Sequence, residues 1–162
     1  MKVVIIEFTK VDLPYGWLGN MYASPIMYEG KIWKTSEALF QALRYEDDEI
    51  REVIRNEKSP MAAKMKAKKF REQMVILPMS ERDVENMKMV VKLKFDQNEV
   101  LKSKLILTGI HKIVENIGIR KGARDLFWGM KKVNGEWIGE NMMGKILMEI
   151  RDQFKSEKNE KK

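Results

Sequence analysis

Residues 35–45 of the chain read TSEALFQALRY, a segment that begins like a helix and continues with helical spacing. Thr35 or Ser36 can cap this helix, because a hydroxyl side chain accepts a hydrogen bond from its first free N–H groups. Apolar residues that recur every three to four positions predict one buried face, formed by Leu39, Phe40 and Leu43.

The opposite face of this helix carries three polar side chains. Glu37, Gln41 and Arg44 stand at i, i+4 and i+7, so a carboxylate, an amide and a guanidinium share one side. The carboxylate could activate water or hold ribose hydroxyls, and the arginine could bind phosphate through two parallel hydrogen bonds. An exposed amphipathic helix, whose early glutamate favours the helix dipole, explains the same spacing. The pattern alone leaves both interpretations open.

Outward from this segment, the sequence predicts a mainly α domain with small β elements. We expect a strand over 3–8, a loop over 12–24, a hairpin over 25–34 and loop-like chain with a small hairpin over 124–138. Helices are expected over 35–45, 48–56, from Ser59-Pro60 onward, over 81–95, over 98–107 and from near Asn141. The α+β domain would span 1–154 as a single unit, followed by a charged flexible tail over 155–162.

The inward face of the 81–95 helix is expected from its apolar residues alone. These residues are Val84, Met87, Val91 and Phe95.

Composition narrows the classes of protein and of chemistry. A chain of 162 residues with 44% apolar residues matches one globular domain. No apolar run approaches the roughly 18–20 residues that span a bilayer, and the first eight residues lack a signal-peptide cleavage site. The absence of cysteine excludes disulfides and thiolate chemistry and agrees with a cytoplasmic location. With His111 as the single histidine, a catalytic acid or base is expected to be a carboxylate or a lysine.

The charge of the chain favours anionic partners. The formal net charge is +7, which suits phosphate-bearing small molecules or nucleic acid. Many basic residues stand beside acidic ones on the expected helix faces, so a lysine-rich, soluble surface explains the charge equally well.

Two other regions combine polar residues and glycines with aromatics, and the second is followed by residues 139–145. Residues 15–20 read YGWLGN and end at Asn20, and residues 125–129 read DLFWG, with Asp125 and Trp128. An aromatic side chain beside glycine in a loop can stack on a flat base. Asn141 stands at a helix start, where N–H groups favour anions, with Lys145 one turn later. A plain turn, a tryptophan-anchored loop and an ordinary N-cap account for the same residues.

Taken together, these segments resemble the YbiA-like, or NADAR, family. Residues 35–45 are similar to its hallmark T-[VS]-E-H-x-F-Q-A-x-K-F. Six further segments resemble other family motifs in the family order, and they are Gly16–Asn20, Ser59–Ala63, Lys92–Phe95, Leu105–Gly109, Phe127–Gly129 and Asn141–Arg151. The resemblance covers about residues 12–154.

The resemblance implies an intracellular enzyme that hydrolyses a ribose C1′–N bond without a metal or redox cofactor. Family substrates include phosphoribosylamino-pyrimidine intermediates of riboflavin synthesis and ADP-ribose on guanine bases, so the expected partner is a phosphorylated ribosyl small molecule or ADP-ribosylated nucleic acid. Such cleavage passes through an oxocarbenium-like centre that a carboxylate can stabilise.

Each site residue takes an expected role from this chemistry. Glu37 is the expected catalytic carboxylate, with Asp125 in reserve. Hydrogen bonds to ribose and base would come from Asn20, Gln41 and Asn141. The ring of Trp128 would stack on the base, and phosphate would be bound by the cations Arg44 and Lys145.

Two departures from the family pattern leave alternatives open. Ala38 replaces the histidine after the hallmark glutamate, and Arg44 replaces a lysine. If the family uses a lysine covalently, arginine cannot supply the neutral amine, and Lys145 is the substitute we name. A non-catalytic ADP-ribose or nucleotide sensor, or a basic nucleic-acid-binding accessory protein, would also fit the sequence.

Overall fold

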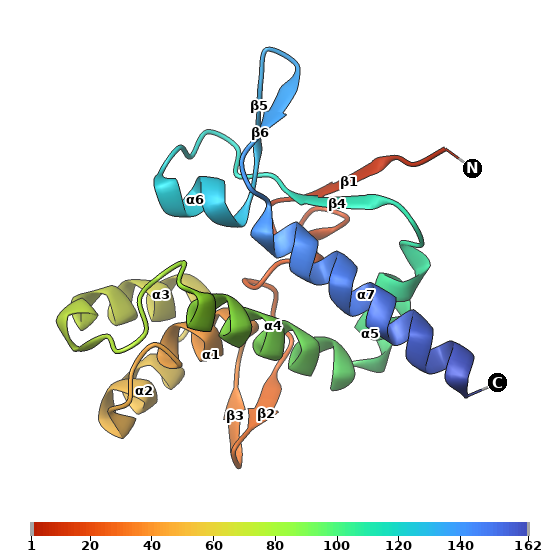
Figure 1. Ribbon diagram of the computed structural model, residues 1–162. Coiled ribbons are helices and arrows are strands. Elements are labelled where there is room, and N and C mark those ends of the chain that lie inside the picture. Colours follow the sequence, from red (N-terminus) through yellow and green to blue (C-terminus); the bar gives the residue numbers. More distant parts are fainter. Residues whose placement is uncertain (1, 162) are drawn as a thin grey trace. The chain divides into compact units, whose positions relative to one another are not determined.

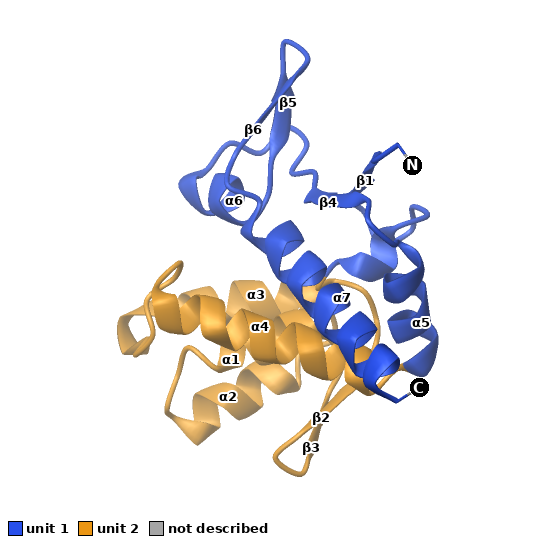
Figure 2. Cartoon of the chain, turned by 45° about the vertical axis from the view of Figure 1, so that its right-hand side comes forward, with its two compact units in different colours: residues 1–19, 99–162 blue, residues 20–98 orange. Residues whose placement is uncertain are grey.

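A computed structural model describes residues 2–161, which fall into two compact units. Unit 2 is the continuous segment Asn20–Asn98, and unit 1 combines the chain up to Gly19 with the chain from Glu99 onward (Figure 2). The expectation of a single domain over 1–154 stays a prediction. Each unit has its own set of packed elements.

Unit 2 is built around helix α1 (Ser36–Ala42), which packs against three helices and one strand of the unit (Figure 1). All seven residues of α1 are buried. The other elements of this unit are β2 (Ile26–Tyr28), β3 (Lys31–Trp33), α2 (Asp48–Arg55), α3 (Pro60–Lys69), η2 (Arg71–Gln73) and α4 (Glu81–Asp96). The strands β2 and β3 form the expected antiparallel hairpin.

The helix starts of unit 2 follow the expected capping chemistry. Thr35 caps α1, its hydroxyl accepting from the N–H of Ala38 at 3.1 Å. Ser59 caps α3 ahead of proline, and Ser80 caps α4 by accepting from the N–H of Asp83. Each hydroxyl satisfies an N–H group that has no partner within its own helix.

The buried face of α4 differs from its expected face. Val84 is only half-buried, whereas Val90 is fully buried, and two charged residues, Asp83 and Lys94, lie on the inner side. The expected inner face was chosen from apolar residues alone, and it therefore left out the buried charged residues Asp83 and Lys94.

Unit 1 is organised by the long helix α7 (Met142–Glu160), which packs against α5, α6 and β4. Its other elements are β1 (Ile5–Phe8), η1 (Gly16–Leu18), α5 (Glu99–Leu107), β4 (Lys112–Glu115), α6 (Ala123–Trp128), β5 (Lys131–Val133) and β6 (Glu136–Ile138). β1 and β4 pair in parallel with Ile6 opposite Ile113, and β5 and β6 form the second hairpin (Figure 1).

Unit 1 contains features that the sequence pattern did not predict. Strand β4 was not expected, and α6 occupies part of the segment that was expected to be a loop. α7 continues through Glu160, so residues 155–160 of the expected tail are helical. Across residues 2–161, no helix combines the length and apolarity that a membrane span requires.

Candidate functional site

The polar face of α1 is buried, which excludes the exposed amphipathic interpretation of this helix. Glu37 is 8% exposed, and Gln41 and Arg44 are buried beside it. The Nε2 of Gln41 donates a hydrogen bond to Oε1 of Glu37 at 2.9 Å. A buried polar group must find a partner or lose stability, and here the partners are other polar side chains.

Arg44 ends this polar row in a buried ion pair. Its Nε and Nη2 donate to the two carboxylate oxygens of Asp83, each at 2.8 Å, and its Nη1 donates to Oε1 of Gln41 at 3.3 Å. The guanidinium also stacks 4.6 Å from the ring centre of Phe40. Asp83 therefore accepts the two parallel hydrogen bonds that Arg44 was expected to donate to phosphate. Phosphate binding by Arg44 stays a prediction.

Asn20 holds the opposite end of α1. Its backbone carbonyl accepts from the N–H of Glu37 at 3.2 Å, and its Oδ1 accepts from the hydroxyl of Ser36 at 2.9 Å. Its Nδ2 lies 3.1 Å from the sulfur of Met87 on α4. Asn20 thus joins the first turn of α1 to the inner face of α4 and lies next to the Glu37 backbone.

Lys94 brings an amine to the same inner face of α4. It is 1% exposed, and burial lowers its pKa from 10.5 to about 7, because a low-dielectric surrounding penalises the ammonium. Its Nζ lies 5.7 Å from the ring centre of Tyr22 and 5.2 Å from that of Phe95. Near neutral pH this amine is available in both protonation states.

The contacts of unit 2 set the order of these groups along α4. Arg44 lies just past the end of α1 and bonds to Asp83 at the start of α4. Asn20, which bonds to the first turn of α1, contacts Met87 one turn further along α4. α1 and α4 therefore run antiparallel. Lys94 follows Met87 by two turns on the same side of α4, so the two packed helices α1 and α4 carry a buried carboxylate and a buried amine within unit 2.

Sequence reasoning missed Asp83 and Lys94, although a signal for them existed. The buried residues of α4 at positions 83, 87, 90 and 94 follow i, i+4, i+7 and i+11 spacing. A charged residue on such an otherwise apolar stripe is a candidate for function.

The four remaining site residues belong to unit 1. Asn141 begins α7 with φ +53° and is buried. Its Oδ1 accepts from the N–H of Glu115 at 3.1 Å, and its Nδ2 donates to the carbonyl of Ile113 at 2.9 Å. The amide of Asn141 therefore attaches the start of α7 to strand β4, and contact with substrate stays a prediction for this residue.

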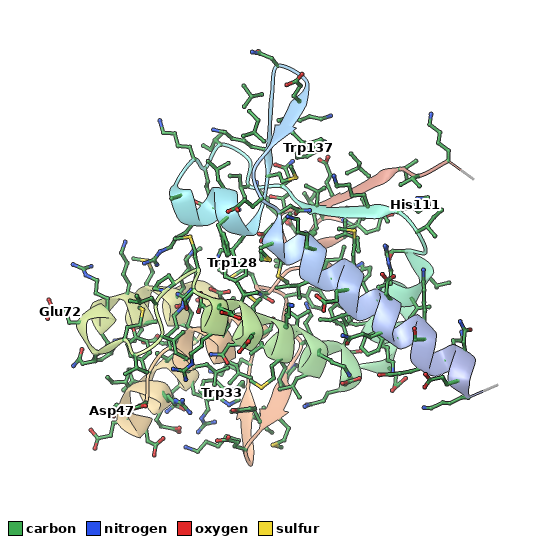
Figure 3. All side chains as sticks on the ribbon, viewed as in Figure 1. Trp33, Asp47, Glu72, His111, Trp128 and Trp137 are labelled. Carbon is green, nitrogen blue, oxygen red and sulfur yellow. The ribbon has the colours of Figure 1, made fainter. Side chains whose placement is uncertain are left out.

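Asp125 and Trp128 lie on α6, and Lys145 lies on α7. Asp125 pairs with Arg120, with Oδ1 and Nη1 3.2 Å apart. Trp128, labelled in Figure 3, is the last residue of α6 and is half-buried. Its ring packs edge-on against that of Phe127, with the ring centres 4.9 Å apart. Lys145 is exposed. Their expected roles in catalysis, base stacking and phosphate binding stay predictions.

Helix α7 is hydrogen-bonded to the turn that follows α5. Arg151 of α7 donates through Nη1 to the hydroxyl of Thr108 at 3.0 Å and to the carbonyl of His111 at 2.7 Å. The Nζ of Lys155 donates to the carbonyl of Gly109. Cations placed just beyond the end of α5 satisfy chain carbonyls there. Leu105–Gly109 and Asn141–Arg151 both resemble family motifs, and the bond between Thr108 and Arg151 joins them.

The described residues 2–161 contain no group of three or more His, Asp or Glu side chains arranged to hold a metal ion. The buried side chains of unit 2 include a carboxylate, an amide and an amine, the groups used in acid–base and nucleophilic chemistry.

The fold and these buried side chains define a small α+β protein with buried acid–base groups on two packed helices. The NADAR domain model matches residues 7–155, and the chain belongs to the NADAR family. It is 35% identical over 160 residues to N-glycosidase YbiA of Escherichia coli, an alignment that covers 98% of this chain and 93% of that protein. The recognised resemblance is thereby confirmed, and the chain is a homologue of an N-glycosidase.

Two further comparisons agree with this assignment. The NMR structure of the E. coli protein YbiA superposes with a TM-score of 0.81 and 34% identity, covering 99% of this chain and 90% of that one. The mainly α fold with small β elements is thus confirmed. The riboflavin biosynthesis protein VVA0006 of Vibrio vulnificus is 30% identical over 154 residues, which are 92% of this chain and 38% of that longer protein.

Proposed function

We propose that this protein hydrolyses the bond between a ribose C1′ and a nitrogen, in a phosphorylated ribosyl substrate. The observation that carries the proposal is the buried carboxylate of Glu37, held by Gln41 and lying in a helix packed against the one that bears the buried amine of Lys94. Homology to N-glycosidase YbiA supports the reaction class.

Glu37 takes the role of the catalytic carboxylate. During cleavage the electron pair of the C1′–N bond leaves with the nitrogen, which takes up a proton, and C1′ develops positive charge. A carboxylate with little exposure stabilises that charge more strongly than one in water, because the local dielectric constant is low. The water molecule that then adds to C1′ can be oriented by the same carboxylate.

Lys94 takes the role of the amine. Burial lowers its pKa to about 7, so a neutral amine is far more accessible at neutral pH than for an ordinary lysine. A neutral amine can accept the proton of the attacking water, or attack C1′ and then be displaced by water. Arg44 cannot do this, and Lys145 is exposed. We therefore assign to Lys94 the amine role that the sequence had left to Lys145.

The relatives and the charge of the chain support a choice of the first substrate to test. A relative named for riboflavin biosynthesis favours a phosphoribosylamino-pyrimidine, a small molecule, as the first substrate to test. The net charge of +7 suits its phosphate and equally suits ADP-ribosylated nucleic acid. In either case Asn20 of unit 2 would bind ribose, and the roles in base stacking and phosphate binding expected of Trp128 and Lys145 in unit 1 stay predictions.

A chromatographic turnover assay with both substrates tests the proposal. We expect release of a sugar product from one of them, and a fall in kcat of about 10²–10⁴-fold in Glu37→Gln with unchanged thermal unfolding. Wild-type rates in Glu37→Gln would refute the role of Glu37. Binding of ADP-ribose without turnover of either substrate would replace the hydrolase by a sensor.

A further inference from the structure

We propose that Asp83, Arg44 and Gln41 form a chain of hydrogen bonds that positions the carboxylate of Glu37 for the reaction. The inference rests on the proposed function and assigns a positioning role to residues that the sequence had linked to phosphate and ribose. The chain runs from α4 to the first turn of α1, and each of its four side chains is buried.

The direction of the chain follows from the chemistry of its members. A guanidinium only donates hydrogen bonds, so the oxygen of the Gln41 amide must face Nη1 of Arg44, 3.3 Å away. The amide nitrogen then faces Glu37, and its N–H donates to Oε1 at 2.9 Å. Arg44 thereby decides which way the Gln41 amide points, and Gln41 decides which oxygen of Glu37 accepts.

The same geometry separates the two oxygens of Glu37. Oε1 is occupied by Gln41, whereas no hydrogen bond within residues 2–161 engages Oε2. A carboxylate held through one oxygen keeps a defined rotamer and leaves the other oxygen for a substrate hydroxyl or a water molecule. Groups held in this way need no reorganisation during the reaction, which is a main source of catalytic power.

Arg44 can perform this role because Asp83 immobilises it. The two charge-assisted hydrogen bonds of 2.8 Å are parallel, a geometry that lysine cannot reproduce. Asp83 is itself fixed, since its Oδ2 also accepts from the N–H of Met79 at 2.8 Å. A buried ion pair is a weak source of net stability but an effective means of orientation. This explains how arginine can stand where the family has lysine.

Two substitutions of Gln41 test the chain, because they change its hydrogen bonding and keep its size. In Gln41→Met the donor to Glu37 is lost, and we expect kcat to fall roughly 10–100-fold with KM changed by less than about threefold. In Gln41→Glu the new carboxylate accepts from Arg44 but cannot donate to Glu37, and we expect a larger fall in kcat. Gln97→Met is the matched control, since the side chain of Gln97 bonds to the backbone N–H and carbonyl of Met27 in β2.

The outcomes separate positioning from packing and from substrate contact. Wild-type kcat in Gln41→Met would show that Gln41 only fills space, and a rise in KM at constant kcat would show direct contact with substrate. Equal losses in Gln41→Met and Gln41→Glu would also overturn the proposed direction of the chain. Arg44→Lys is expected to retain more activity than Arg44→Met, because it keeps a donor and a charge.

A measurement without substrate distinguishes this inference from the proposed function. The ¹³C carboxyl signal of Glu37, identified by its loss in Glu37→Gln, should move in Gln41→Met and stay in Gln97→Met. If it moves but the wild-type protein releases no sugar, the hydrolase proposal fails and the chain of hydrogen bonds stands. An unmoved signal would overturn the chain whatever the activity.

Discussion

Unit 1 and unit 2 both bury polar side chains, but they use them differently. In unit 1, Asn141 and Arg151 bond mainly to backbone groups, the former to β4 and the latter to the turn after α5. In unit 2, Glu37 and Arg44 bond to other side chains, and Lys94 is buried with its pKa lowered. Side chains bonded to the backbone complete a fold, whereas carboxylate, amide and amine groups buried in a core are suited to chemistry.

The largest expected effect is the loss of activity in Lys94→Met. Methionine fills a similar volume without the amine, so kcat should fall by about 10²–10⁴-fold while the protein stays folded. Lys92→Met is the matched control, because Lys92 lies on the same helix in an exposed ion pair with Asp96. Equal activities in the two variants would remove Lys94 from the chemistry and weaken the contrast between the units.

The same substitution should stabilise the protein, most strongly at low pH. The pKa of Lys94 falls from 10.5 to about 7 on folding, which corresponds to a cost of about 5 kcal/mol when the amine is protonated in both states. Between these values the unfolded chain holds a proton that the folded protein lacks, so wild-type stability rises with pH from about 7 to about 10.5. Urea unfolding should show that the gain of Lys94→Met is largest below pH 7 and vanishes toward pH 10.5. A gain that does not vary with pH would contradict this account.

Breaking the ion pair of unit 2 should change the free energy of unfolding by a similar amount in the opposite direction, as a loss. Asp83→Asn leaves Arg44 buried without a counter-charge, and we expect a loss of about 3–5 kcal/mol in the free energy of unfolding. Urea denaturation at pH 7 measures it, with Glu52→Gln as a control in the exposed pair with Lys31. Similar small losses in both variants would mean that Arg44 is solvated.

A steric substitution in unit 1 should affect stability and leave the chemistry unchanged. A Cβ at Gly144 would lie 2.2 Å from the carbonyl oxygen of Ile113 on β4, so Gly144→Ala should lower the free energy of unfolding by about 1–3 kcal/mol. Elsewhere in a helix, alanine would be the more stable residue. The activity of the folded fraction, measured well below the unfolding temperature, should equal that of the wild type. A lower kcat there would give α7 a part in the reaction.

The smallest expected effect belongs to Lys145. An exposed cation contributes about 0.2–1 kcal/mol to an ionic contact, so Lys145→Met should raise KM by about fivefold at most and leave kcat unchanged. Steady-state kinetics at low ionic strength, where such contacts are least screened, is the measurement. A loss of kcat as large as that in Lys94→Met would return the amine role to Lys145.

Local rules explain which parts of the fold could be predicted. The caps at Thr35, Ser59 and Ser80 and the hairpin turns depend on residues a few positions apart, so their chemistry is visible in the chain. The parallel pairing of β1 with β4 joins segments more than a hundred positions apart, and no local sequence pattern predicts it. The helix α6 was not predicted because it is short, and six residues are too few to show helical periodicity.

The sequence by itself determined the family and the helical character of the chain, and it predicted Glu37 and its neighbours as the candidate site, because motif order and spacing can be compared without coordinates. Only the tertiary structure decided that the polar face of α1 is buried, that Asp83 pairs with Arg44 and that Lys94 has a lowered pKa. The physical reason is that burial and ionisation depend on which groups surround a side chain, and those groups come from helices distant in sequence.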